Sequence, residues 1–183
     1  MQPILQTPRL DLRPAALADA DALWALWTDP AVRRFLWDDR VISPIEAADT
    51  LGDCLALAPK GLGLWVAEAR DADAVVGCAG LLPVSTAASY DPRLAGLVEP
   101  LVALTPAVWG RGYAGEMLDA LLAHAAGALG LARLAAVTDV PNVASDRMLQ
   151  RAGFDVLGEV PGPRYRLRTY LWHAPPSSDA VER

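Results

Sequence analysis

The sequence predicts one mixed α/β domain, and three observations carry that prediction. The chain has 183 residues, a length that suits a single domain with a real core. It is 53% hydrophobic and 21% charged, and it contains no apolar run of about 18 residues, so we expect a soluble globular protein without a membrane span. Its periodic segments follow the order strand, two helices, three strands, helix, strand, helix and two strands.

The first elements are predicted by alternation and by residues typical of helix ends. Apolar and polar residues alternate in RLDLRP, residues 9–14, which predicts an opening strand that Pro14 ends. Asp19 is expected to cap a helix that runs to about Trp27. A loop or short helix follows and carries Phe35 and Trp37.

The clearest helix start in the chain is SPIE, residues 43–46, with Ser at the N-cap, Pro at the first helical position and Glu closing a capping box. We expect this helix to run from Pro44 to about Leu57. Residues 64–69 and 75–82 are apolar and flank an acidic turn, which predicts a hairpin. The long loop at residues 85–95 is expected to border a pocket.

Residues 99–115, EPLVALTPAVWGRGYAG, carry the strongest functional pattern. A strand is expected to lead through a short linker into Gly110, Gly112 and Gly115, and a helix then runs from Gly112 to about Gly127. The first two glycines remove side chains that would block a close approach, and the amides at a helix start suit an anion. The stretch therefore predicts a loop that binds a pyrophosphate.

The last third of the chain predicts a strand, a helix and two further strands. Residues 134–137 form a short apolar run, and Asn142 can cap a helix that ends near Gly153. Residues 154–157 and 165–172 are the expected final strands. We expect one domain over residues 1–175, followed by a disordered polar tail at 176–183.

Composition excludes several function classes. The formal net charge of −6 argues against nucleic acid and mildly favours a cationic small molecule or a basic peptide. Cys54 and Cys78 are expected to be reduced, buried thiols, and His124 and His173 suggest no metal site. The first residues contain no secretory signal pattern, so we expect a cytoplasmic protein.

The glycines also match a dinucleotide pattern, which we reject. GRGYAG, residues 110–115, fits G-x-G-x-x-G, and Asp139 ends the next predicted strand, where an acid would bind a ribose. However, five residues including Pro106 and Trp109 separate Leu104 from the first glycine, whereas the dinucleotide turn begins at the end of its strand. Only 44 residues follow Asp139, too few for a second mononucleotide-binding half.

Two motifs together resemble another family. WGRGYA, at residues 109–114, and the N-x-x-S…L…G-F pattern at residues 142–154 resemble the GCN5-related N-acetyltransferases (GNAT), within them the branch that acetylates ribosomal-protein N-termini, RimJ/RimL-like. The general loop pattern begins with Gln or Arg, but this branch commonly has Trp, as at Trp109. Residues 5–23 and 73–81 also resemble the branch. The resemblance covers residues 5–172 and implies a mostly antiparallel twisted sheet of about six to seven strands flanked by about four helices.

This resemblance implies an enzyme that moves an acetyl group from acetyl-CoA to a primary amine by direct transfer, without a metal. A backbone amide of the strand would polarise the thioester carbonyl. The implied coenzyme-binding residues are Val102, Ala103, Leu104 and Thr105 along the strand, Trp109, Gly110, Arg111, Gly112, Tyr113, Ala114 and Gly115 in the loop, and Asn142 and Ser145 on the following helix.

Glu99 is the expected general base, because it precedes Pro106 by seven residues, the spacing of the branch's strand glutamate. Glu68 and Asp91 are the alternatives. Leu149 fills the place where much of the superfamily has a tyrosine, which leaves Ser145 as the proton donor to the departing thiolate, unless it only caps its helix. The residues expected at the acceptor are Phe35, Trp37, Glu68, Tyr90 and Glu99.

Three questions stay open at the level of sequence. The acceptor is either a protein N-terminus or a small-molecule amine. A non-catalytic acyl-CoA-binding module on the same fold is the alternative to an enzyme. Both a monomer and a homodimer are compatible with the sequence.

Overall fold

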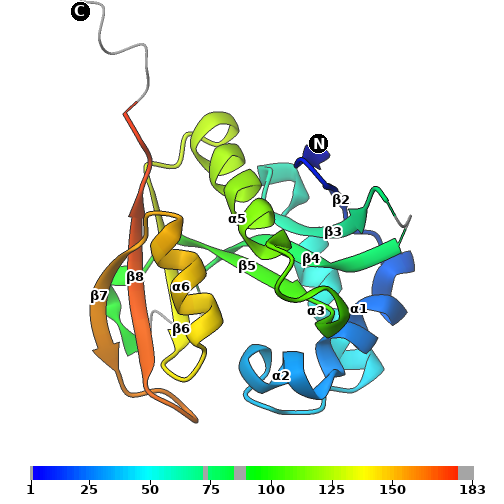
Figure 1. Ribbon diagram of the computed structural model, residues 1–183, viewed down its shortest axis with the longest axis horizontal. Coiled ribbons are helices and arrows are strands. Elements are labelled where there is room, and N and C mark those ends of the chain that lie inside the picture. Colours follow the sequence, from blue (N-terminus) through cyan, green and yellow to red (C-terminus); the bar gives the residue numbers. More distant parts are fainter. Residues whose placement is uncertain (1, 72–73, 85–89, 177–183) are drawn as a thin grey trace, which may run out of the picture.

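The computed structural model describes residues 2–71, 74–84 and 90–176, which form an α+β fold with two sheets (Figure 1). All paired strands are antiparallel. The first sheet has the strand order of the chain: β1 (Leu5–Gln6), β2 (Leu10–Pro14), β3 (Gly63–Ala69), β4 (Ala74–Pro83) and β5 (Val98–Leu104). The second sheet has the order β6 (Arg133–Asp139), β8 (Leu167–His173) and β7 (Asp155–Val160).

Five α-helices lie in the described part of the chain. They are α1 (Ala20–Thr28), α2 (Pro30–Leu36), α3 (Pro44–Leu55), α5 (Tyr113–Ala123) and α6 (Val143–Arg151). The mixed α/β class is confirmed, but eight strands in two sheets replace the expected six to seven in one. The difference arises from the two-residue strand β1 and from the separation of β5 and β6. Within the described ranges, no helix is long and apolar enough to cross a membrane.

Helix starts follow the predicted caps with two exceptions. The Ser43 side chain accepts a hydrogen bond from the Glu46 amide, as expected. The Glu46 carboxylate does not complete the capping box but accepts from Arg40. Asp19 does not cap α1 with its side chain, because its carboxylate is held by Arg13 and by the Ala16 amide.

Helices pack on both faces of the first sheet. On one face, α5 places Met117 and Leu121 against Leu10 and Trp65 of the sheet, all fully buried. On the other face, α1 and α3 cover a second cluster. Its main members are Leu23, Leu26, Trp27, Leu51, Val66 and Cys78. Cys54 and Cys78 are both free and buried, which confirms the expected thiols.

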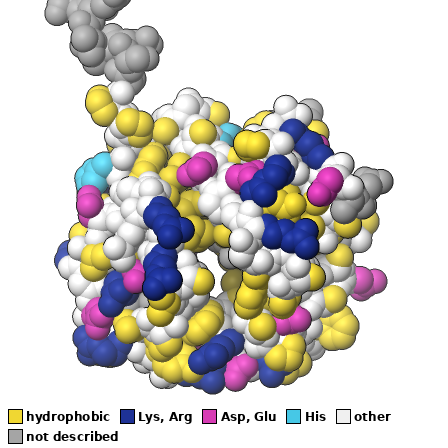
Figure 2. All heavy atoms as spheres, viewed as in Figure 1, with side chains coloured by type: hydrophobic (Ala, Val, Ile, Leu, Met, Phe, Trp, Pro, Cys, Tyr) yellow, Lys and Arg dark blue, Asp and Glu magenta, His cyan; other side chains and the backbone are white. Residues whose placement is uncertain are grey.

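The two sheets separate between β5 and β6. The starts of these strands lie together, since residues 96–98 and 130–133 line one shallow depression. The strands then diverge, and α5 follows one while α6 follows the other (Figure 1). Figure 2 shows an opening between α6 and the start of α5, with Lys and Arg side chains on both rims. We call this opening the central hollow.

Candidate active site

The glycine loop lies at the end of β5 on one side of the central hollow. A single 3-10 turn, Pro106–Val108, separates β5 from the loop. Gly110 and Gly112 have φ angles of 76° and 84°, in the left-handed region that side chains disfavour. The Trp109 indole Nε1 donates to the Leu104 carbonyl at 2.8 Å and ties the loop back to its strand, although half of the Trp109 side chain is exposed.

The loop fits a pyrophosphate. The N-cap residue of α5 is Gly112, which has no side chain to cap the first amides of the helix. A Cβ added at Gly110 or Gly115 would meet no atom within 4 Å, so the backbone at these positions borders open space. Unsatisfied amides beside open space at a helix start favour an anion.

The residues that support this loop come from a distant part of the chain and carry no local sequence pattern. Thr7 and Arg9, between β1 and β2, contact Glu116 in the first turn of α5, and Arg9 also contacts the loop itself. The sequence shows an acidic residue, Glu116, in the first turn of the helix. The residues that bind it lie more than 100 positions earlier in the chain.

The side of β5 that faces β6 pairs with no strand in the described residues. Ala103 and Leu104 bury their side chains in the core, whereas Val102 and Thr105 are half-buried. An extended ligand along this edge would therefore meet mainly backbone groups.

Glu99 lies near the start of β5, where the two sheets come together, and pairs with Leu82 of β4. It is half-buried, and the described residues give it no hydrogen bond or ion pair. Burial raises the pKa of its carboxyl to about 7. A carboxylate of this kind can take up and release a proton at neutral pH.

The two alternative bases are both engaged by arginine side chains, and Glu68 also lies far from Glu99. Glu68 pairs with Val75, seven residues from Leu82 along β4, a span of about 23 Å at the rise of a strand. Its Oε1 accepts from the Arg13 Nε at 2.7 Å.

Asp91 is buried and accepts from Arg93 and from the Thr169 hydroxyl. The Arg93 hydrogen bond lowers its pKa to about 2. Both Glu68 and Asp91 are therefore bound to an arginine, and neither is a free base.

The predicted acceptor aromatics have different surroundings. The ring centre of Phe35, in α2, lies 6.4 Å from that of Tyr165, in the β7–β8 loop. These two segments, distant in sequence, are therefore in contact. Trp37 lies 6.0 Å from Trp27 and packs against the second core cluster. Tyr90 is half-buried, and the preceding residues 85–89, part of the loop expected to border a pocket, lie outside the described residues.

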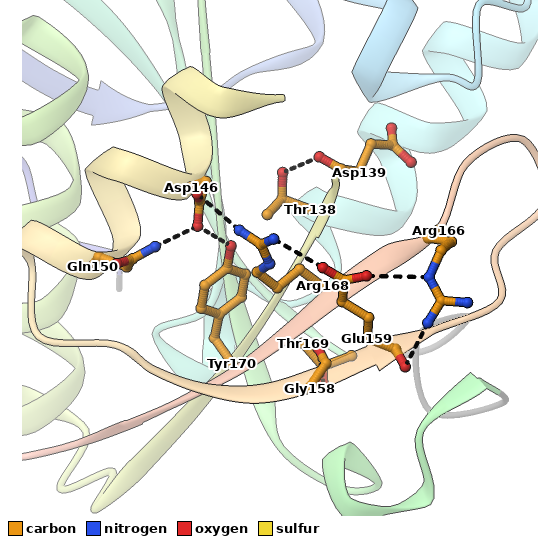
Figure 3. Close-up of polar contacts among 10 residues, drawn as sticks. All are labelled: Thr138, Asp139, Asp146, Gln150, Gly158, Glu159, Arg166, Arg168, Thr169 and Tyr170. Carbon is orange, nitrogen blue, oxygen red and sulfur yellow. Dashed lines mark hydrogen bonds and ion pairs between the residues drawn. The ribbon is translucent and has the colours of Figure 1, made fainter. Parts of the chain in front are cut away.

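The start of α6 forms the other side of the central hollow. The Asn142 side chain accepts from the Ser145 amide at 3.3 Å, which confirms the predicted cap. The Asp146 carboxylate accepts from the Tyr170 hydroxyl at 2.7 Å and from Arg168 at 3.0 Å (Figure 3). These bonds join α6 to β8 next to Ser145, which is half-buried in the first turn of α6.

Asp139, at the end of β6, is another buried carboxyl group. Only 7% of the residue is exposed, and its Oδ1 has no partner in the described structure. Burial raises its pKa, nearby Asp38 raises it further and Arg164 opposes both. Figure 3 shows its carboxylate turned away from the Asp146 bonds.

Comparisons with known proteins match this architecture. A family model described as an acetyltransferase (GNAT) domain matches residues 9–155. The uncharacterized N-acetyltransferase YoaA of Bacillus subtilis is 31% identical over 159 residues, which cover 86% of this chain and 86% of YoaA.

Two solved structures share the fold. A GnaT-family acetyltransferase from Bordetella pertussis gives a TM-score of 0.81 at 24% identity, covering 93% of this chain and 99% of the other. RimL, a ribosomal L7/L12 alpha-N-protein acetyltransferase solved in complex with coenzyme A, gives a TM-score of 0.75 at 19% identity, covering 93% of this chain and 98% of RimL. The range matched by the family model includes both helix starts that flank the central hollow.

Proposed function

This chain belongs to the GNAT acetyltransferase family and is an acetyl-CoA-dependent N-acetyltransferase, and from that premise we propose direct acetyl transfer to a primary amine with Glu99 as the general base. The observation that carries the proposal is the half-buried Glu99 carboxyl with a pKa of about 7 and no partner in the described structure. The same strand leads into the glycine loop, so the base and the anion site share one element.

The glycine loop and the start of α5 would hold the coenzyme pyrophosphate through backbone amides. The edge of β5 at residues 102–105 would pair with the pantetheine chain. The coenzyme supplies an acetyl group activated as a thioester. Binding at these sites orients that group toward the start of β5.

The protein side chains move the protons. Glu99 accepts a proton from the acceptor ammonium, directly or through a water molecule, which frees the nitrogen lone pair to form the new C–N bond. The Ser145 hydroxyl donates a proton to the sulfur as the C–S bond breaks. The nitrogen loses its second proton as it becomes an amide, and that proton returns to Ser145 through water. Phe35, Trp37 and Tyr90 would border the acceptor.

The acceptor is a primary amine on either a protein N-terminus or a small molecule. The formal net charge of −6 favours a cationic acceptor, because an ammonium group is attracted to an acidic protein. RimL acts on a ribosomal protein N-terminus by its description, which makes peptide N-termini the first acceptors to test.

The proposal is tested with Glu99→Gln in an assay of coenzyme A thiol release over a panel of peptides and small amines. We expect kcat to fall about 100- to 10,000-fold, the usual contribution of a positioned base, while the Kd for acetyl-CoA stays within about 2-fold. In the wild type, kcat/KM should rise with pH through about 7, because Glu99 must lose its proton before it can accept one. The pH profile of Glu99→Gln should lack that rise.

Glu68→Gln is the matched control, since it removes a carboxylate from the same sheet that is bound to Arg13. It should leave kcat nearly unchanged. An equal loss in both variants would contradict the assignment of Glu99. Coenzyme binding without thiol release for any amine would favour a non-catalytic acyl-CoA-binding module.

A further inference from the structure

Three residues near the N-terminus and in α5 form a contact network that none of the proposed chemistry uses. The Thr7 hydroxyl donates to the Glu116 Oε2 at 2.8 Å, and the Arg9 amide donates to the same oxygen at 3.2 Å. The Arg9 Nε donates to the Glu116 Oε1 at 2.6 Å. We call these contacts the Thr7–Arg9–Glu116 network.

Arg9 extends from this network onto the glycine loop. Its Nη2 donates to the Arg111 carbonyl at 2.7 Å, and its guanidinium lies 4.6 Å from the centre of the Tyr113 ring. A Cβ added at Gly112 would lie 3.3 Å from the same Nη2. One side chain therefore contacts Arg111 and Tyr113 and lies beside Gly112 between them.

The contact with the Arg111 carbonyl fixes the next amide. In a trans peptide the C=O and N–H groups point in opposite directions. A carbonyl held toward Arg9 therefore directs the Gly112 N–H away from Arg9. Gly112 has no side chain of its own to impose this orientation, and its neighbour Gly110 is equally free.

We propose that Arg9 and Glu116 are positioning residues for the coenzyme, and that they hold the glycine loop in its anion-binding conformation before the coenzyme arrives. This inference rests on the proposed function, which assigns the loop to the pyrophosphate. A loop that is already ordered loses less conformational entropy on binding, so its affinity is higher. The Arg9 side chain is 48% exposed, so its ion pair adds little to global stability.

The test measures the Kd of coenzyme A by calorimetry for Arg9→Ala and for Glu116→Gln. We expect each variant to weaken binding about 10-fold and to raise the KM for acetyl-CoA by a similar factor, with kcat within about 2-fold. The double variant should weaken binding much less than the product of the two single effects, because both changes disrupt one network.

Glu116→Gln separates positioning from a direct charge effect. If Arg9 acted only as a positive charge beside the phosphates, loss of the Glu116 charge would leave binding unchanged or make it tighter. That result would overturn the inference. Full recovery in Arg9→Lys would also overturn it, since one ammonium cannot replace the guanidinium fork that reaches Glu116 and the Arg111 carbonyl together.

Arg70→Ala is the matched control. Arg70 binds Asp11 at 2.7 Å and reaches the Pro8 carbonyl at 3.5 Å, so it holds the same N-terminal segment without contacting the loop. We expect an unchanged Kd, and a loss equal to that of Arg9→Ala would contradict the inference. Failure of the wild type to bind coenzyme A would instead contradict the proposed function.

Discussion

Helices α5 and α6 begin on opposite sides of the central hollow, and their first turns are built in opposite ways. Helix α5 begins at a left-handed glycine, Gly112, with no side-chain cap. Helix α6 begins at Asn142, whose side chain accepts from the Ser145 amide. The start of α5 therefore leaves amides for an external anion, whereas the start of α6 satisfies the Ser145 amide with its own side chain.

The first turns of the two helices are anchored in a similar way but to different parts of the fold. Arg9 and Thr7 hold Glu116 of α5 from the N-terminal segment, while Tyr170 and Arg168 hold Asp146 of α6 from the second sheet (Figure 3). In each case a carboxylate in the first turn is bonded to a different part of the fold. The comparison teaches that both helix starts are fixed to another part of the fold, but only the start of α5 lacks a side-chain cap on its first amides.

The largest effect is expected for Gly112→Glu. This change adds a negative charge and a strained residue where the φ angle is 84°, and its Cβ would crowd Arg9. At a coenzyme concentration of about 100 Kd, the wild type should gain about 2.7 kcal/mol, a rise of about 5–10 °C in Tm, and the variant should show no rise.

Gly52→Glu controls for this change, because Gly52 lies in α3 with open space around it. It should keep the full rise in Tm with acetyl-CoA. A normal rise in Gly112→Glu would show that the start of α5 is not the anion site.

A smaller effect, on stability, is expected for Asp146→Asn. The change weakens the charge-assisted bond with Arg168 and the bond from Tyr170, a loss of about 2 kcal/mol in the free energy of unfolding. Thermal melts should show Tm lower by about 4–8 °C, with the Kd for coenzyme A within about 3-fold of wild type. Asp119→Asn, on the exposed surface of α5, should change neither quantity, and a large loss of affinity in Asp146→Asn would show that the α6 anchor also shapes the coenzyme site.

The smallest effect is expected for Asn142→Ala, which removes the cap of α6. Loss of one such cap lowers the free energy of unfolding by about 1 kcal/mol. Ser43→Ala removes an equivalent cap from α3 and should lower Tm by a similar amount. If Asn142 also contacts the coenzyme, only its variant should raise the KM for acetyl-CoA, by about 3-fold; an unchanged KM would leave Asn142 as a cap alone.

Local patterns predicted the parts of this fold that short stretches of sequence determine. The cap at Ser43, the cap at Asn142 and the left-handed glycine at Gly153 all appear where turn chemistry placed them. The glycine loop between β5 and α5 also follows from a contiguous motif. In each case the interacting groups lie within a few residues of one another.

Contacts between distant segments were not predictable in this way. Asp19 was expected to cap α1, but Arg13 holds its carboxylate. Glu68 was expected near the acceptor, yet the register of β4 places it far from Glu99. Periodicity predicts that a residue is in a strand but not which edge, partner or end of the sheet it meets.

The separation of β5 from β6 also bears on self-association. An unpaired strand edge is a template on which another polypeptide can add a strand, the first step of edge-to-edge aggregation. Here the two edges face each other across the central hollow, and α5 and α6 flank it (Figure 1). The fold thus turns these backbone hydrogen-bonding groups toward the hollow, where a slender, extended ligand has more room than a second folded chain.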